Sequence, residues 1–327
     1  MGVACGAHKN GLQSDSFTES VTMTLMMNDD GTLVLNASLH ELGCGVVTMM
    51  RVIVGEVLGV DPQHVAASEA DTDATPFDIG CLGSRMTYVG GAAARATAEE
   101  LRTRLLQVAA MVLGVEPDRL SARDGSVCVR GADDQGVPFS RIVREGRARF
   151  GDDVIVTTTY KGTSNPGSYS VQFAEVEVDT ATGLTRVTDF LAVSDVGMAI
   201  NRGMVEAQFQ GAVQMGIGYA LHEDLPLDAA GRVPPGGFKA YHMVNMPDMP
   251  DVRVLLIEHP GDDGPFGAKS VGEIATVPTA PAVINAVNHA LGTCISVLPA
   301  TPERIVAAVR GDDTVSAGGA ACLTGCF

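Results

Sequence analysis

A polar stretch near the middle of the chain constrains the fold most, because β-rich patterning starts again after it. Residues 160–167 (YKGTSNPG) combine Gly, Ser, Asn and Pro, which favour loops over regular structure. The 327 residues suffice for two units of about 150 residues, each with a core of its own. We therefore predict lobes at 1–160 and 161–312, followed by a flexible Gly/Ala-rich tail at 313–327.

The first half is patterned for a hairpin followed by helices. Extended runs at 20–27 and 32–39 flank Asn28-Asp29-Asp30-Gly31, a sequence typical of a tight turn. Apolar spacing predicts a helix over 46–60, and the Ala/Leu face of 92–115 predicts a second helix that packs on a sheet.

The second half repeats the order of strands before helices. Residues 170–179 and 184–197 are extended and are joined by the turn sequence TATG, which predicts another antiparallel pair. Helices are predicted over 204–223 and 278–292, with a strand at 252–259 between them. The predicted class is α+β, with a mixed or antiparallel sheet and flanking helices in each lobe.

Composition excludes several functions. The net charge of −17 and the absence of Trp argue against nucleic-acid binding, which needs a basic footprint. No apolar run is long enough to span a bilayer, and the N-terminus lacks a secretory signal, so we expect a cytoplasmic protein without membrane contact. The seven Cys are scattered without CxxC spacing, which predicts neither a disulfide framework nor a zinc or iron–sulfur site.

Three glycine-rich turns precede helices, at 43–45, 80–85 and 264–273. Main-chain N–H groups at such turns favour an anionic ligand, although each turn alone is more often an ordinary loop. The third is not a Walker A motif, because Ala268 stands where Gly must precede Lys269-Ser270. No GxGxxG follows a strand, so a Rossmann dinucleotide site is not predicted either.

Glu273 is the candidate catalytic residue. It follows Gly272 at the end of the third turn and precedes an apolar stretch, where a partly desolvated carboxylate suits a general base. The alternative is that Glu273 caps the following helix. The residues alone do not separate these two roles.

Residues 264–292 (GPFGAKSVGEIATVPTAPAVINAVNHALG) resemble the closing signature of the molybdenum hydroxylases, the xanthine dehydrogenase/aldehyde oxidase family. Segments 41–60, 68–96 and 174–225 follow in the family's order, so the resemblance extends from about Gly2 to Arg310. It identifies the chain with the C-terminal half of a molybdopterin-binding subunit. It resembles the medium subunit of nicotinate and purine hydroxylases that divide this region between two polypeptides.

The resemblance implies a two-lobed fold that binds molybdopterin, commonly as the cytosine dinucleotide. Molybdenum would be held by the pterin dithiolene, without a protein ligand. The implied reaction hydroxylates an electron-poor carbon of an N-heterocycle (purine or nicotinate type) or an aldehyde, with oxygen from water. A glutamate matching Glu273 would act as general base on a metal-bound hydroxyl.

Further site residues follow by position from the resemblance. Gly43, Cys44 and Gly45 would lie beside the molybdenum, and Gln208 would lie at the cofactor. Gly272 and Glu273 would complete the site on the substrate side. Pterin or phosphate groups would be held through main-chain and hydroxyl contacts by Cys81, Leu82, Gly83, Ser84 and Arg85. We interpret Glu175, Asp195 and Asn201 as structural turns and caps.

The sequence departs from the family at two cysteines. Cys44 stands where many members have glutamine, which leaves four readings: an altered oxo contact, a redox-modifiable thiol, a degraded site or a tolerated substitution. Cys81 replaces a small or hydroxylated residue, and we interpret it as packing.

The sequence also lacks the first half of the family's molybdopterin region, a set of cluster-binding cysteines and a flavin-domain pattern. The resemblance therefore implies partners: a larger molybdopterin subunit, a 2Fe-2S subunit and an FAD subunit. Two alternatives stay open, a non-catalytic protein that carries or assembles the cofactor, and an isolated fragment.

Overall fold

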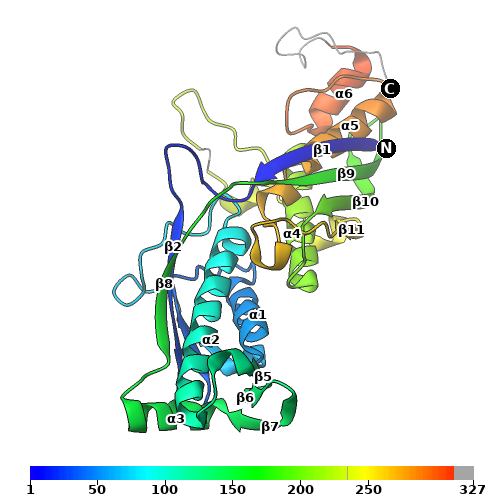
Figure 1. Ribbon diagram of the computed structural model, residues 1–327. Coiled ribbons are helices and arrows are strands. Elements are labelled where there is room, and N and C mark those ends of the chain that lie inside the picture. Colours follow the sequence, from blue (N-terminus) through cyan, green and yellow to red (C-terminus); the bar gives the residue numbers. More distant parts are fainter. Residues whose placement is uncertain (234, 313–327) are drawn as a thin grey trace.

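The computed structural model describes residues 1–233 and 235–312, except for the side chains of residues 133–135. The tail predicted to be flexible, residues 313–327, lies outside the described residues. Two lobes, each with a sheet and helices packed on it, make up an α+β architecture (Figure 1). Each lobe has a hydrophobic core of its own.

The first lobe is built on a mixed four-stranded sheet in the order β4-β3-β2-β8. The predicted hairpin is confirmed, since β2 (Ser20–Met27) pairs antiparallel with β3 (Leu33–Asn36). β8 (Ile155–Lys161) lies antiparallel to β2, and β4 (Val65–Ala67) lies parallel to β3. The hairpin orients its alternate apolar side chains toward one face, where the helices cover them.

Two helices cover this sheet, as the apolar spacing predicted. α1 (Val46–Leu58) ends at Gly59, which adopts the left-handed conformation with φ 67°. α2 (Gly91–Leu113) packs against α1 and against strands β2 and β8. The core between them is almost fully apolar and includes Met23, Leu25, Met50, Ile53, Leu101 and Leu105.

A small antiparallel sheet and one helix close the far end of the first lobe (Figure 1). The sheet contains β5 (Leu120–Arg123), β6 (Ser126–Val129) and β7 (Ala132–Pro138) in that order. α3 (Phe139–Phe150) follows directly and packs against α2. These elements lie far from the residues predicted to bind a cofactor.

The second lobe has a four-stranded sheet in the order β1-β9-β10-β11. The predicted antiparallel pair is confirmed as β9 (Gly167–Val178) and β10 (Thr185–Asp195). β11 (Val252–Ile257) lies parallel to β10 on one side. On the other side β1 (Gly2–Lys9) pairs antiparallel with β9 along its whole length.

The position of β1 differs from the predicted assignment of residues 1–160 to the first lobe. Gly2 pairs with Ala174 and Lys9 pairs with Gly167, so the strand belongs to the second sheet. A Cβ atom on Gly2 would lie 2.1 Å from the main-chain nitrogen of Ala286, so only glycine permits this close packing. Local patterning cannot reveal the difference, because the partner strand is distant in sequence.

Three helices complete the second lobe. α4 (Arg202–Leu221) and α5 (Thr279–Leu291) pack against each other, and α5 also contacts β1 and β9. α6 (Pro302–Arg310) follows near the C-terminus. Within the described residues, none of the helices has the length and apolar character that a membrane-spanning segment requires.

Candidate active site

The glycine-rich loops of the two lobes meet at a cavity of about 590 Å³. Eight of the predicted site residues line it, which brings together positions up to 229 residues apart in the chain (44 to 273). The first lobe contributes Cys44, Cys81, Leu82, Ser84 and Arg85, and the second contributes Gln208, Gly272 and Glu273. The remaining predicted residues, Gly43, Gly45 and Gly83, shape the loops through positive φ angles of 87°, 75° and 59°.

The first loop is held by a carboxylate within the same segment. Glu41 accepts hydrogen bonds from the main-chain N–H groups of Gly43 at 2.9 Å, Gly45 at 2.9 Å and Val47 at 3.2 Å. These N–H groups are therefore paired within the chain, as in the ordinary loop that the sequence also allowed. A nearby carboxylate satisfies the unpaired donors at the start of α1 and leaves the Cys44 side chain at the cavity wall.

A buried ionic network anchors the second loop. The Arg85 guanidinium is completely buried, where it pairs with Glu19 and with Asp78 Oδ1 at 2.6 Å. It also donates to the Gly80 carbonyl at 3.1 Å. This side chain is therefore committed to the protein, and only the main chain of Arg85 remains for a contact with pterin or phosphate. The sequence could not distinguish a structural arginine from a ligand-binding one.

Ser84 joins the two lobes at the cavity. Its hydroxyl donates to Glu273 Oε2, and the Glu273 main-chain N–H donates to Ser84 Oγ at 3.2 Å. A Cβ atom on Gly272 would lie 2.9 Å from Ser84 Oγ, so the glycine before Glu273 makes room for this contact. Ser84 itself has a φ of 52°, which is uncommon for a residue other than glycine and marks a site worth functional attention.

The Glu273 side chain faces the cavity and does not cap a helix. Glu273 starts a short 3₁₀ turn, Glu273–Ala275, and α5 begins later, after Pro278. The side chain is 48% exposed in this chain, and its Oε2 lies 3.9 Å from Nδ1 of His8. His8 has no predictive signal in the sequence, because the pairing of β1 with β9 is what brings it here.

Two thiols share the cavity wall. Cys44 and Cys81 are hydrogen-bonded to each other, and both are half-buried. The hydrogen bond from Cys81 lowers the pKa of Cys44 to about 6, against the opposing effect of burial. The same hydrogen bond and burial raise the pKa of Cys81. The interpretation of Cys81 as mere packing is incomplete, because its thiol has a specific partner.

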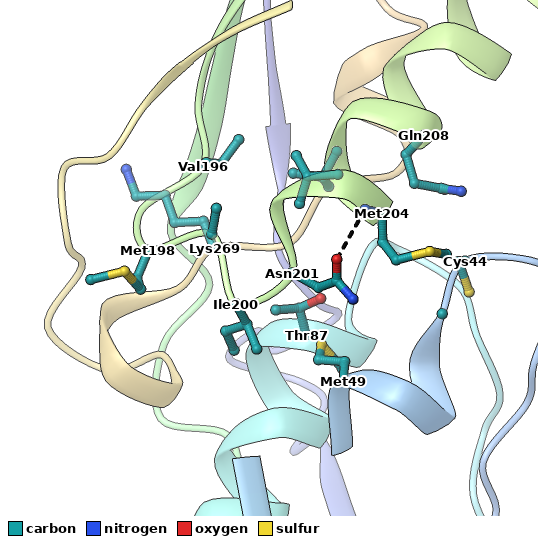
Figure 2. Close-up of a pocket in the computed structure, with 14 residues that line it drawn as sticks. Cys44, Met49, Thr87, Val196, Met198, Ile200, Asn201, Met204, Gln208 and Lys269 are labelled. Atoms are coloured by element: carbon teal, nitrogen blue, oxygen red, sulfur yellow. Dashed lines mark hydrogen bonds between the residues drawn. The ribbon is translucent and has the colours of Figure 1, made fainter. Parts of the chain in front are cut away.

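A smaller pocket of about 50 Å³ adjoins the cavity and shares the wall formed by Cys44 and Gln208 (Figure 2). The Gln208 amide makes no hydrogen bond within the described part of the chain, so it is available to a ligand. Asn201 accepts from the Met204 N–H at 3.2 Å and so caps α4, as the sequence indicated (Figure 2).

Two other charged residues have structural surroundings. Asp195 accepts from the Gly197 N–H at 3.1 Å and forms an ion pair with Lys269, which is consistent with its predicted role in a turn. The pair neutralises Lys269 at the wall of the smaller pocket. Glu175 is exposed on β9.

Comparison with known proteins assigns the family. A family model described as molybdopterin cofactor-binding domain matches residues 1–250. The chain belongs to this family. The resemblance to the molybdenum hydroxylases is thereby confirmed, and relatives that it matches are named as a xanthine dehydrogenase molybdenum-binding subunit, a hypoxanthine oxidase and an aldehyde oxidoreductase.

Two curated relatives illustrate the similarity. The chain is 32% identical over 310 residues to a putative xanthine dehydrogenase molybdenum-binding subunit of Escherichia coli K12, covering 93% of this chain and 41% of the relative. It is 29% identical over 300 residues to the nicotine 6-hydroxylase large subunit of Paenarthrobacter nicotinovorans, covering 89% of this chain and 37% of the relative. The chain thus spans about two fifths of the length of these relatives.

A solved structure agrees with the fold. Quinoline 2-oxidoreductase from Pseudomonas putida 86 superposes with a TM-score of 0.84 at 30% identity, over 94% of this chain and 41% of that one.

The cavity of this molybdopterin-binding chain fits an organic cofactor better than a bare metal ion. The Gln208 amide, which has no partner among the described residues, offers hydrogen bonds to pterin heteroatoms. Among the described residues, no group of three or more His, Cys, Asp or Glu is placed to hold a metal. The donor set therefore suits a group that brings its own metal-binding sulfurs.

Proposed function

We propose that this chain is a molybdopterin-binding part of a molybdenum hydroxylase and that Glu273 is its general base. The observation that carries the proposal is the convergence of the predicted loops and Glu273 on one cavity between the lobes. The confirmed family supports the cofactor, and the names of the relatives support an oxidoreductase.

When bound, molybdopterin supplies a molybdenum centre that accepts two electrons from the substrate. Gln208, on α4, would donate from its amide to the cofactor at the wall shared by the two pockets. The main chain of residues 80–85 would follow the pterin, since the Arg85 side chain is committed elsewhere. We propose the cytosine dinucleotide form of the cofactor.

Ser84 would orient the base. Its hydroxyl donates to Glu273 Oε2, which is also the oxygen nearest to Nδ1 of His8. The second carboxylate oxygen, Oε1, takes no part in either contact. An ionised carboxylate held in this way can accept a proton at Oε1 from a group bound in the cavity.

We further propose partner subunits: a larger molybdopterin subunit, a 2Fe-2S subunit and an FAD subunit that carry the electrons away. Two relatives are named as parts of assemblies, the large subunit of nicotine 6-hydroxylase and subunit gamma of a 6-hydroxypseudooxynicotine dehydrogenase complex. Large apolar side chains are exposed among the residues that line the cavity, as expected where a partner covers it: Leu42, Leu82 and Met215. Such an assembly would be cytoplasmic.

The proposed substrate is an N-heterocycle of the purine or nicotinate type, or an aldehyde. Relatives and neighbours are named for xanthine, hypoxanthine, nicotine, quinoline and aldehyde. These compounds share an electron-poor carbon next to nitrogen or oxygen. The cavity volume of about 590 Å³ lies in the range of sites that bind small organic molecules.

The substitution Glu273→Gln tests the base in the native assembly. We expect turnover to fall by roughly 10²- to 10⁴-fold, because the amide cannot accept the proton. Molybdenum content per chain should not change, since Glu273 is not proposed to hold the cofactor. The control is Glu56→Gln, which makes the same chemical change at an exposed residue of α1. Retained turnover in Glu273→Gln would remove the residue from the mechanism.

A further inference from the structure

Cys44 and Cys81 come from different loops and meet at the cavity. Cys44 precedes α1, and Cys81 lies in the loop that leads to the π-helical turn Met86–Gly90. Their thiols are hydrogen-bonded, both are half-buried, and both line the 590 Å³ cavity. Neither forms a disulfide in this structure. Cys81 therefore has a specific chemical partner, which its predicted role in packing does not include.

We infer that Cys44 and Cys81 are a site of reversible disulfide formation in the wall of the molybdopterin cavity. The existence of the site rests on the two thiols themselves. Its consequence for the cofactor rests on the proposed function. The bond would tie the loop before α1 to the loop before the π-helical turn, and so change the shape of the wall that a cofactor contacts.

Glycines and open space surround the two cysteines. A disulfide needs an S–S distance of about 2 Å, which is shorter than a thiol hydrogen bond. Glycines flank the two residues, with φ 87° at Gly43, 75° at Gly45 and 98° at Gly80. A Cβ atom at Gly43 would meet nothing within 4 Å, so open space surrounds this side of the loop.

The two thiols are suited to different roles in the reaction. The pKa of Cys44 is lowered to about 6, chiefly by the hydrogen bond from Cys81, so Cys44 is the thiolate near neutral pH. The pKa of Cys81 is raised by the same hydrogen bond, by burial and by the charges of Cys44 and Glu273. Cys44 is therefore the attacking thiol, and Cys81 is the resolving thiol.

The reaction with a low-molecular-weight disulfide balances in two exchanges. The Cys44 thiolate attacks one sulfur of oxidised glutathione, which breaks the S–S bond and releases one glutathione thiolate. Cys81 then loses its proton and attacks the Cys44 sulfur, which releases the second glutathione. Two electrons pass from the protein to the reagent, which is reduced to two thiols.

The bond would alter the part of the wall that Cys44 shares with Gln208. Because Cys44 lines both the cavity and the adjoining smaller pocket, its movement toward Cys81 changes both spaces. We expect oxidised chain to take up less molybdopterin than reduced chain. By the same linkage, bound cofactor should slow the oxidation of the pair.

Peptide mass spectrometry on the full-length chain tests the site directly. The chain is incubated with oxidised glutathione, its free thiols are blocked with N-ethylmaleimide, and it is then digested. We expect a peptide pair linked through Cys44 and Cys81, lighter than the sum of the reduced peptides by two hydrogen atoms, and lost after dithiothreitol treatment. Cys44→Ser and Cys81→Ser should each abolish the linked pair. The matched control Cys5→Ser, at an exposed position of β1, should retain it.

The inference is overturned if wild-type chain carries glutathione or maleimide on Cys44 and Cys81 separately, with no linked pair. This readout uses unmodified protein, so it does not depend on the folding of a variant. Molybdenum and pterin content of the native assembly are measured in parallel. A linked pair in a protein that never carries the cofactor would refute the proposed function and leave the disulfide site standing. Cofactor without a linked pair would refute only the disulfide.

Discussion

The two walls of the cavity are fixed by different kinds of interaction. In the first lobe, the loop before the π-helical turn is anchored by charge, through the buried Arg85 and its partners Glu19 and Asp78. In the second lobe, Ser270, three residues before Glu273, is anchored by neutral hydrogen bonds, in which Asn10 Oδ1 accepts from its N–H at 2.9 Å, and the ion pair of Lys269 with Asp195 lies next to it at the smaller pocket. Charge and neutral contacts respond differently to substitution, so the contribution of each wall can be measured separately.

The neutral network also explains how the lobes are held in register. The Ser270 hydroxyl accepts from the Tyr88 N–H at 2.9 Å, which connects the second-lobe loop to the π-helical turn of the first lobe. The Ser168 hydroxyl donates to the Ser270 carbonyl at 3.0 Å, which connects the same loop to β9. Ser270, Ser168 and Asn10 are all buried, so these bonds are shielded from competing water.

Arg85→Met should have the largest effect on stability. Removal of the guanidinium leaves Glu19 and Asp78 as unpaired buried carboxylates, and we expect a loss of about 3–5 kcal/mol in the free energy of unfolding. Denaturant unfolding measures it. The control Arg253→Met breaks an exposed pair with Asp189 and should cost at most about 1 kcal/mol. Equal losses in the two variants would contradict a wall anchored by charge.

Asn10→Ala should cost less, since it removes neutral bonds. The Ser270 N–H would lose its acceptor in a buried position, with an expected loss of about 1–3 kcal/mol. The same unfolding experiment compares it with Asn285→Ala, which removes an exposed bond to the Val3 carbonyl. A loss in Asn10→Ala as large as that in Arg85→Met would break the contrast between the two walls.

Ser84→Ala tests the contact across the cavity. Without the hydroxyl, Glu273 loses the donor that holds Oε2, and we expect kcat to fall about tenfold with little change in KM. A purely structural role would instead lower the amount of folded protein and leave kcat per folded molecule unchanged. The control Ser16→Ala, at an exposed loop position, should not change either constant. An unchanged kcat in Ser84→Ala would show that Glu273 is oriented without this contact.

Cys44 reactivity provides the finest test of the first-lobe wall. The rate of alkylation of Cys44 by iodoacetamide should rise with pH, with a midpoint at about pH 6, because the hydrogen bond from Cys81 stabilises the Cys44 thiolate. Below that pH the thiolate becomes protonated and the rate falls. Cys81→Ala removes the donor and should move the midpoint upward, whereas Cys81→Ser keeps a donor and should move it less. Identical midpoints in wild type and Cys81→Ala would show that Cys81 does not affect the pKa of Cys44.

The sequence predicted the features that depend on residues close together in the chain. The turn at Asn28–Gly31 located the β2–β3 hairpin, Gly59 located the end of α1, and the motif 264–292 identified the family. These features have local causes: turn chemistry, helix termination and an ordered motif.

The remainder depends on contacts between distant segments. The pairing of β1 with β9 brings His8 to Glu273, and the burial of Arg85 depends on Glu19, which lies 66 residues earlier in the chain. Cys81 meets Cys44 only because α1 and the loop before α2 close on the same cavity. None of these contacts changes the local pattern of either partner, so a single sequence contains no signal for them.

The molybdenum and pterin content of the native assembly tests the central claim most directly. The chain is purified with whatever accompanies it, molybdenum is measured by plasma mass spectrometry, and the pterin is released and identified by its fluorescence. The account predicts molybdenum and pterin in equal amounts, stoichiometric with the chain, and a lower content of both in Gln208→Ala. A natively purified assembly with neither molybdenum nor pterin would contradict a cofactor site between the two lobes.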